Sequence, residues 1–215
     1  GFDSQILTPA FSLGDYSKLH NNALVSGYKP IKIGHNCWVG QHTILNCTES
    51  LIIGNNVGIG PQSRLWTHVA SGELLEGCTL FGQYPLTLED NVLIVGGAVI
   101  SPGLIVKHNS VVMTGAVLTK STKPYNTYAG VPAKNITKKL NFWKNLSLDE
   151  KFNLLKNFVK EFIVKNGQYK DRVYFKEFCD LNDSNFNSFK NKEGLLFVKK
   201  VDDWNVFNKF KYCQI

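Results

Sequence analysis

The chain has 215 residues, of which 43% are hydrophobic and 19% charged, and its formal net charge is +7. This balance excludes a disordered protein, and no stretch approaches the roughly 18 uninterrupted apolar residues that a membrane-spanning helix needs. Almost all of the positive charge comes from scattered Lys, which indicates a solvated surface rather than a nucleic-acid-binding one.

The first predicted element is a repeat of six residues. A period of six differs from the 3.6 of a helix and is too long for strand alternation. It fits a prism in which each six residues supply one short strand and one turn, with the aliphatic residue pointing inward. Gly and Asn fill the turns, as bends with positive φ require. The aliphatic positions are Ile33, Val39 and Leu45 and, after a two-residue shift, Ile53, Ile59 and Leu65.

The repeat is interrupted between Leu65 and Leu88. The intervening residues 66–87 are too many for a corner turn, and long loops on repeat scaffolds often carry function. His68 stands at the root of this loop, directly beyond a rigid strand, which is a favourable position for a catalytic group. The remaining histidines occupy turns or precede the repeat, and we expect them at the surface; they are His20, His35, His42 and His108.

Six further hexads follow the loop, at Leu88, Ile94, Ile100, Val106, Val112 and Leu118. Small residues, expected to pack near the corners, lie four positions after three of them, at Ala98, Ser110 and Ala116. The twelve hexads predict four coils of three faces, which gain stability by stacking. The alternative is an antiparallel β-sandwich with closely spaced turns.

After residue 139 the composition changes to Lys, Asn and Phe with helix signals. Ser147 and Glu150 have the spacing of a capping box, and apolar residues at helical spacing follow, so we expect a helix that ends near Gly167. Strands are expected at Val173–Phe178 and Leu195–Val201. The chain is therefore divided into residues 1–139, a β-helix, and residues 140–215, a helix with a small α/β appendage of open role.

The cysteines and the first residues bear on the compartment. Five cysteines without C-x-x-C spacing indicate neither a disulfide framework nor a zinc site. Residues 1–30 lack a basic region followed by an apolar run, so we expect no signal peptide. Reduced thiols in a cytoplasmic protein are the simplest interpretation; the cysteines are Cys37, Cys47, Cys78, Cys179 and Cys213.

Two stretches carry a family resemblance. Residues 88–136 include LEDNVLIVGGAVISPGLIVKHNSVVMTGAVLTKS followed by PYNTYAGVPAKNI, and the loop begins with LWTH. These stretches resemble the hexapeptide-repeat acetyltransferases, the group of maltose, galactoside and antibiotic acetyltransferases, over about residues 31–137. The A-G-V-P-A-K element after V-L-T-K is the most specific part. The resemblance implies a mainly β fold, a left-handed parallel β-helix with an extended loop, and a homotrimer with active sites between subunits.

The resemblance also implies contacts with the acyl donor acetyl-CoA. Gly96 matches a position that touches the pantetheine arm, and Thr114 one whose backbone contacts it. Thr119 and Lys120 match a pair near the nucleotide end, and Lys134 replaces a basic residue that faces the phosphates. A basic surface would also suit an anionic molecule such as coenzyme A.

Three positions depart from the pattern of these relatives. Many of them have Trp at the position of Leu93, near the coenzyme arm, and Gly at the position of Val95. Many also have an H-P dipeptide where this chain reads His68-Val69. These changes concern the coenzyme contacts and leave the expected fold unchanged.

The expected chemistry is acyl transfer, in which His68 matches the general base. A neutral imidazole removes the acceptor proton, a contribution of roughly 10²–10⁴ in rate. Glu73 or Glu76 could orient the ring, although both also suit a solvated loop. Lys120, Lys123 and Lys134 would place positive charge near the coenzyme phosphates. No metal is expected, and nothing in the spacing marks Cys78 as a nucleophile.

The favoured acceptor is a carbohydrate hydroxyl, as in surface-polysaccharide assembly. The amino group of a nucleotide-linked amino sugar comes second and an antibiotic third. A metal-dependent hydratase resembling the γ-class carbonic anhydrases is a rival, but it needs two His ligands five residues apart, and no pair here has that spacing. A structural or assembly solenoid without catalysis is the other rival; it would not need the His68 loop. No nucleic-acid partner is expected.

Overall fold

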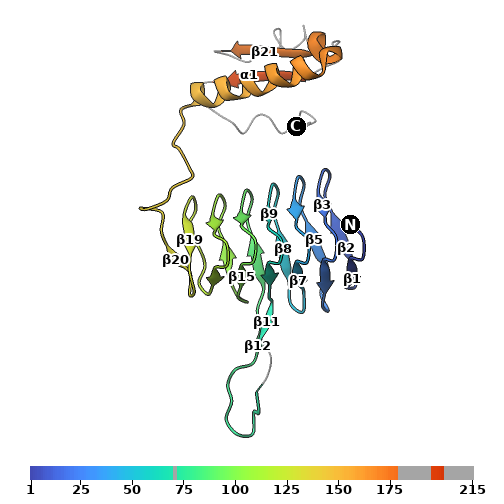
Figure 1. The fold of residues 1–215 in the computed structure, drawn as a ribbon, viewed down its shortest axis with the longest axis vertical. Helices are drawn as coiled ribbons and strands as arrows, with labels where there is room; N and C mark the ends of the chain where they lie inside the picture. Colours follow the sequence, from blue (N-terminus) through green and yellow to red (C-terminus); the bar gives the residue numbers. More distant parts are fainter. Residues whose placement is uncertain (70–71, 179–194, 201–215) are drawn as a thin grey trace. The chain divides into compact units, whose positions relative to one another are not determined.

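The computed structural model describes residues 1–69, 72–178 and 195–200, and the chain divides into two compact units, Gly1–Trp143 and Lys144–Ile215. The first unit is a left-handed parallel β-helix of about six turns. Figure 1 shows it as a row of stacked coils, with β1 (Gln5–Leu7) at one end and β19 (Thr127–Ala129) at the other. The fold class expected from the six-residue repeat is therefore confirmed.

Each coil contributes short strands to three parallel sheets, which form three faces. The first face comprises β1, β4 (Leu24–Ser26), β7 (Ile44–Asn46), β10 (Arg64–Leu65), β15 (Val99–Ile100) and β18 (Val117–Leu118). The second comprises β2 (Phe11–Leu13), β5 (Ile31–Ile33), β8 (Leu51–Ile53), β13 (Leu86–Leu88) and β16 (Ile105–Val106). The third comprises β3 (Lys18–Leu19), β6 (Trp38–Val39), β9 (Gly58–Ile59), β14 (Leu93–Ile94), β17 (Val111–Val112) and β19, with β20 (Lys134–Asn135) antiparallel to β19.

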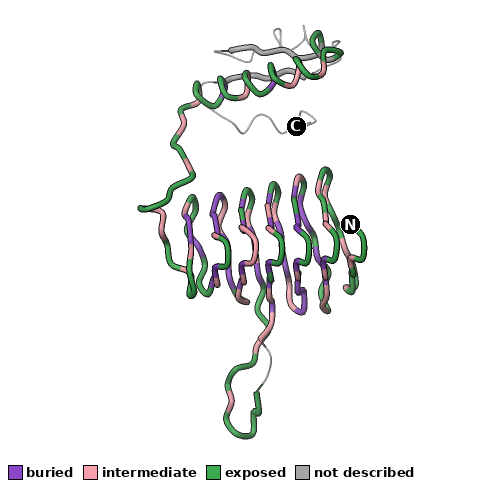
Figure 2. Tube along the Cα trace, viewed as in Figure 1, coloured by how far each residue is buried: buried purple, intermediate pink, exposed green. Residues whose placement is uncertain are grey.

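The core is a column of aliphatic side chains inside the prism. Figure 2 shows buried positions recurring along the stacked coils. All twelve hexad residues predicted to point inward are buried, with at most 2% of their surface exposed. Ile94, for example, is in register with Ile59 on one neighbouring coil and with Val112 on the other. The small residues Ala98, Ser110 and Ala116 are fully buried as well. Each coil therefore buries its apolar side only by stacking on its neighbours.

One corner of the prism is built from stacked asparagines. Asn36, Asn56, Asn91 and Asn109 occupy equivalent turns between the second and third faces, and all adopt left-handed φ values of 54–59°. Asn tolerates this region better than other non-glycine residues. The Nδ2 group of Asn36 donates to Oδ1 of Asn56 at 2.9 Å, and Nδ2 of Asn56 donates to Oδ1 of Asn91 at 2.8 Å. The turn residues thus join successive coils.

The solenoid begins earlier than the twelve hexads indicated. Leu13, Leu19 and Val25 also recur every six residues and lie in the first coils, and Ile6 is the residue in register with Val25 on the coil before. The exposed fraction falls from 43% at Ile6 to 38% at Leu13 and 0% at Val25, because the first coil has a neighbour on one side only. The expectation of four coils was therefore too low.

The second unit begins with α1 (Leu148–Lys165), whose start and end agree with the expected helix. The Ser147 side chain accepts the N–H of Glu150 at 3.3 Å, and the Glu150 carboxylate accepts the N–H of Ser147 at 2.7 Å. The predicted capping box is thus confirmed. No helix in the described part of the chain has both the length and the apolar character needed to cross a membrane.

A short 3-10 helix, η1 (Gly167–Arg172), leads into β21 (Val173–Phe178), which pairs in parallel with β22 (Leu195–Lys200). Both strands were expected close to these bounds. Val201, the expected last residue of the second strand, lies outside the described residues, as do Cys179 and Cys213.

Candidate active site

The loop that interrupts the repeat leaves the corner between the first and second faces. It starts as a narrow stem in which β11 (His68–Val69) pairs antiparallel with β12 (Gly82–Gln83), and Figure 1 shows it projecting from the solenoid. Beyond the stem, Leu74, Leu75, Leu80 and Phe81 are exposed, each by more than half of its surface. Residues 70–71 of the loop lie outside the described part. The stem fixes the backbone of His68 against the solenoid.

His68 is held by a side chain from the preceding coil. Asn46 ends β7, the neighbour of β10 on the first face, and only 5% of its surface is exposed. Its Oδ1 atom lies 2.9 Å from Nδ1 of the partly exposed His68. The ring of Trp66 meets the His68 ring edge-on, with 5.8 Å between ring centroids. Among the described residues, no hydrogen bond reaches Nε2 of His68.

The orienting residue differs from the two carboxylates suggested by the sequence. The Glu73 carboxylate accepts the N–H of Leu75 at 3.0 Å within the loop, and Glu76 is exposed. Asn46 takes that position instead. It lies 22 residues before His68, and an Asn at the end of a strand belongs to no short motif, so only the stacking of coils brings the two together.

The residues expected to contact the pantetheine arm lie at one corner. Gly96 follows β14 and Thr114 follows β17, so both occupy turns between the third and first faces. These turns are stacked, since the N–H of Gly115 donates to the carbonyl of Gly96 at 3.2 Å. Gly96 and Thr114 therefore lie on adjacent coils.

The residues expected near the nucleotide end surround β18. Thr119 and Lys120 directly follow this strand and are exposed. Lys134 belongs to β20, and the segment before it packs beside β18, because the N–H of Ala133 donates to the carbonyl of Val117 at 2.8 Å. The structure thus groups these three polar residues at the closing coil.

His68 shares a strand end with this group. It lies beyond the end of β10, and Thr119 lies beyond the corresponding end of β18. Only β15 separates the two strands in the first face. Since neighbouring strands are about 4.8 Å apart, the two strand ends are about 10 Å apart along the solenoid axis.

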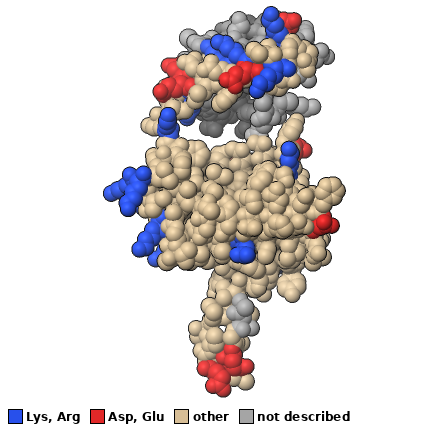
Figure 3. All heavy atoms as spheres, viewed as in Figure 1, with Lys and Arg blue, Asp and Glu red and all other residues tan. Residues whose placement is uncertain are grey.

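The closing coils carry an unbalanced positive charge. Residues 91–148 contain seven Lys and no Asp or Glu. Figure 3 shows Lys side chains gathered at the end of the solenoid that holds β19 and β20, whereas acidic side chains mark the tip of the loop. The exposed members within the first unit are Lys120, Lys123, Lys134, Lys138 and Lys139, and Lys144, the first residue of the second unit, is exposed as well.

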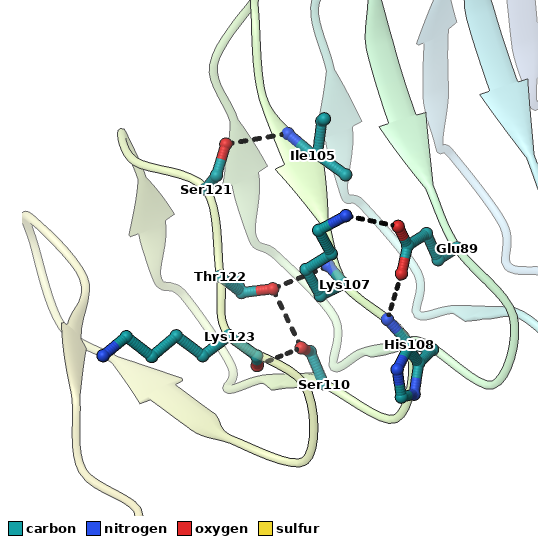
Figure 4. Close-up of polar contacts among 8 residues, drawn as sticks. All are labelled: Glu89, Ile105, Lys107, His108, Ser110, Ser121, Thr122 and Lys123. Atoms are coloured by element: carbon teal, nitrogen blue, oxygen red, sulfur yellow. Dashed lines mark hydrogen bonds and ion pairs between the residues drawn. The ribbon is translucent and has the colours of Figure 1, made fainter.

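A cluster of hydrogen bonds holds the segment that follows β18 against the neighbouring turns (Figure 4). The hydroxyl of Ser121 accepts the N–H of Ile105 at 2.9 Å, and that of Thr122 accepts the N–H of Lys107 at 2.8 Å. The Ser110 hydroxyl donates to the carbonyl of Lys123 at 3.0 Å. Together with the backbone hydrogen bond from the N–H of Thr122 to the carbonyl of Ile105 at 3.1 Å, these side chains hold the segment between Lys120 and Lys123.

The carboxylate of Glu89, which belongs to this cluster, is expected to make a pH-dependent contribution to the free energy of unfolding. Its hydrogen bond to Lys107, at 2.7 Å, and the N–H of His108 lower the pKa of the carboxyl group. The pKa of Glu89 is lower in the folded state than in the unfolded state. The charged carboxylate therefore stabilises the fold fully at a pH above the unfolded-state pKa. This stabilisation is lost as the pH falls through the folded-state pKa. We expect Glu89→Gln to lower the free energy of unfolding at pH 7 by ~0.2–1 kcal/mol, as for a partly exposed ion pair.

The measurement is urea unfolding of the wild type and the Glu89→Gln variant at pH 7 and pH 3. At pH 3, below the ordinary Glu pKa of about 4.3, the difference between the two proteins should shrink. A difference that is equal at both pH values would contradict this assignment.

Two of the three departures from the family pattern, Leu93 and Val95, lie in a groove of about 830 Å³ on the third face. Trp38, Phe142 and Trp143 line this groove as well. Leu93 exposes 46% of its surface.

The described cysteines have no disulfide partner. Cys37 and Cys47 are buried in the solenoid, and burial raises the pKa of the Cys37 thiol. Cys78 is partly exposed in the loop. In the part of the chain that the structure describes, no three His, Cys, Asp or Glu side chains cluster as a metal site would need.

Comparison with known proteins adds a relationship in sequence. No protein-family profile matches this chain. A protein of Schizosaccharomyces pombe that carries an acetyltransferase name is 37% identical over 99 residues, which are 43% of this chain and 47% of that protein. Galactoside O-acetyltransferase of Escherichia coli is 32% identical over 108 residues, 49% of this chain and 53% of that protein. The solenoid is related to the hexapeptide-repeat acetyltransferases.

Solved structures share the fold with this hexapeptide-repeat chain. A hexapeptide-repeat acetyltransferase of Vibrio cholerae, in complex with acetyl-CoA, has a TM-score of 0.54 and 23% identity, and 62% of this chain and 72% of that chain are covered. A variant N-acyltransferase of Bacillus cereus, in complex with dTDP-4-amino-4,6-dideoxyglucose and coenzyme A, has a TM-score of 0.55 and 16% identity, with coverage of 75% and 92%. The chain spans about half the length of the two curated relatives named above.

Proposed function

We propose that this protein is an acetyl-CoA-dependent acetyltransferase that acts on a hydroxyl of a carbohydrate acceptor, with His68 as general base. The observation that carries the proposal is the 2.9 Å contact between Nδ1 of His68 and Oδ1 of Asn46. A ring that donates from Nδ1 keeps a lone pair on Nε2, and this is the atom that can accept a proton. The acetyltransferase relatives in sequence support acetyl-CoA as the donor.

The proposed reaction is direct transfer in a ternary complex. The acceptor oxygen bonds to the acetyl carbon while its proton passes to Nε2 of His68. The carbon–sulfur bond then breaks, and the imidazolium returns the proton to the leaving thiolate. No covalent enzyme intermediate is needed, so Cys78 has no assigned role. Transfer then depends mainly on holding the two substrates in one orientation.

The coenzyme site of the proposal follows the first face. Gly96 and Thr114 would contact the pantetheine arm at one end of the strands, and Thr119, Lys120 and Lys134 the nucleotide end at the closing coil. The excess of Lys over acidic residues in residues 91–148 supports the binding of an anionic ligand there. The proposal includes a homotrimer with active sites between subunits and a cytoplasmic location, for which the unpaired thiols offer support.

The alternative acceptor is the amino group of a nucleotide-linked amino sugar. The Bacillus cereus N-acyltransferase described above shares the fold and holds such a sugar in its complex. A screen of neutral sugars and nucleotide-linked amino sugars, read by coenzyme A release, separates the two. Turnover with amino sugars alone would replace O-acetylation by N-acetylation.

The first test is calorimetric titration of the protein with acetyl-CoA. We expect saturable binding that Lys120→Ala and Lys134→Ala weaken, because each removes a positive charge near the phosphates. Lys32→Ala is the matched control, since this exposed Lys lies on β5 of the second face. Absence of binding at millimolar ligand would overturn the acetyltransferase proposal in favour of a structural solenoid.

A further inference from the structure

We infer that Asn46 is the positioning residue of His68, and that it holds the ring in the tautomer that leaves Nε2 basic. This inference rests on the proposed function, because it assigns a role within the same site. Asn46 acts through His68, and nothing places it against either substrate. Its role follows from the orientation of its own amide group.

Backbone groups fix the orientation of that amide. The Oδ1 atom of Asn46 accepts the N–H of Thr67 at 3.2 Å and that of Thr48 at 3.4 Å. Its Nδ2 group donates to the carbonyl of Ser26 at 3.3 Å and to the Thr48 hydroxyl at 3.0 Å. A flipped amide would turn NH₂ toward two N–H donors and oxygen toward a carbonyl, so the flip is excluded.

The tautomer of His68 follows from this orientation. Since Oδ1 can only accept, Nδ1 of His68 must carry the proton of the 2.9 Å hydrogen bond. The second ring nitrogen, Nε2, is then unprotonated in the neutral ring and available as a base. An imidazole free in solution favours the opposite tautomer, with the proton on Nε2. Asn46 therefore selects the form that general-base catalysis from Nε2 requires.

Asn46 is also a rigid support. It ends a strand of the first face, is 95% buried, and bonds to three other residues that are adjacent to it in space: Ser26, Thr48 and Thr67. The Thr67 hydroxyl, 2.7 Å from Oδ1, also accepts the N–H of Glu49 at 3.0 Å. The amide thus ties the root of the loop to the two preceding coils. Such support limits the rotation of the His68 ring.

No charged side chain forms a hydrogen bond with the His68 ring in the described part of the chain, so Asn46 is its hydrogen-bond partner. Glu49 follows β7, and its carboxylate accepts the N–H of Ser50 at 2.8 Å rather than a bond from the ring. The ionisable side chains on the elements packed around this corner are Tyr28, Lys29, Cys47, Glu49, Arg64 and, in the loop, Glu73, Glu76, Cys78 and Tyr84. A carboxylate placed at position 46 would therefore be the charge directly bonded to the ring.

The direct test is the tautomer of His68, measured by two-bond ¹H–¹⁵N correlation of the imidazole groups in the intact protein. His68→Gln identifies the His68 signals by their loss. We expect the Nδ1–H pattern in the wild type and the Nε2–H form, or a mixture, in Asn46→Ala. Asn55→Ala is the matched control, because Oδ1 of Asn55 also accepts a backbone N–H, that of His35 at 2.9 Å, at another corner. A wild-type ring in the Nε2–H form would overturn the inference.

The second test separates positioning from a structural role by kinetics. We expect Asn46→Ala to lower kcat by about 10- to 100-fold, by analogy with the loss of a partner that orients a metal-bound histidine, with an unchanged KM for acetyl-CoA. Asn46→Asp keeps the acceptor atom and should restore most of kcat. Its negative charge stabilises the imidazolium, so the acid limb of the kcat profile should move to higher pH. Equal kcat in the wild type and both variants would overturn the inference.

The two experiments also distinguish failure of this inference from failure of the proposed function. The correlation spectrum reports the tautomer without any turnover, and it needs no variant at position 46 to fold. Absence of acetyl transfer with every acceptor would overturn the proposed function, whereas the Nδ1–H pattern would still establish the Asn46 contact.

Discussion

His68→Ala is expected to lower acetyl transfer by roughly 10²–10⁴-fold, the range that a positioned general base contributes. The side chain is partly exposed at the root of the loop, and Asn46 holds its Nδ1 side at 2.9 Å. Alanine removes the proton acceptor and leaves the strands of the solenoid in place. The measurement is coenzyme A release at saturating acetyl-CoA, with the acceptors that support turnover of the wild type.

Two controls accompany this variant. Binding of acetyl-CoA, measured by calorimetry, should stay within about twofold of the wild type, because the proposed donor contacts lie on other residues. His35→Ala, at an exposed turn between the second and third faces, should retain wild-type turnover. Near-normal turnover of His68→Ala would remove His68 from the reaction.

Ile94→Ala is expected to reduce the free energy of unfolding by about 2–5 kcal/mol, as large-to-small substitutions in packed cores do. Ile94 is fully buried, and its strand pairs with coils on both sides, so the cavity opens between stacked neighbours. The measurement is urea unfolding of the purified protein, with the transition followed by circular dichroism.

Leu93→Ala is the matched control, because Leu93 is the other residue of the same strand and exposes 46% of its surface. It should cost about 1 kcal/mol, less than Ile94→Ala, because nearly half of the Leu93 surface stays in water on folding. An equal loss of unfolding free energy in the two variants would contradict the assignment of Ile94 to the core and Leu93 to the surface.

The sequence was sufficient for the fold where the repeat was complete. Positions such as Ile59 and Ile94 have neighbours on both sides, so burial keeps every one of them aliphatic. The first coils were missed because Ile6 lies seven residues before Leu13, both remain partly exposed, and the shift after Val25 breaks the count again. The helix α1 was predictable because its capping box and apolar spacing are local signals.

The candidate site was predictable only in part. His68 could be found because it begins the segment that breaks the repeat. Asn46 could not, because the contact depends on how two coils stack and not on any spacing within one of them. The pairing of an ordinary amide with the ring becomes visible only once β7 and β10 are side by side.

The order β10, β15 and β18 within the first face makes the solenoid a molecular ruler. Each step from one strand to the next advances the chain by about 4.8 Å, and from β15 to β18 the step takes 18 residues, as the pairing of Val99 with Val117 shows. The separation between His68 and the Lys-rich closing coil is therefore counted in whole coils. Length changes in the loop leave this separation unaltered, whereas the gain or loss of one coil would change it by about 4.8 Å. The loop of residues 66–87 can thus vary in length while the distance from the end of β10 to the closing coil is preserved.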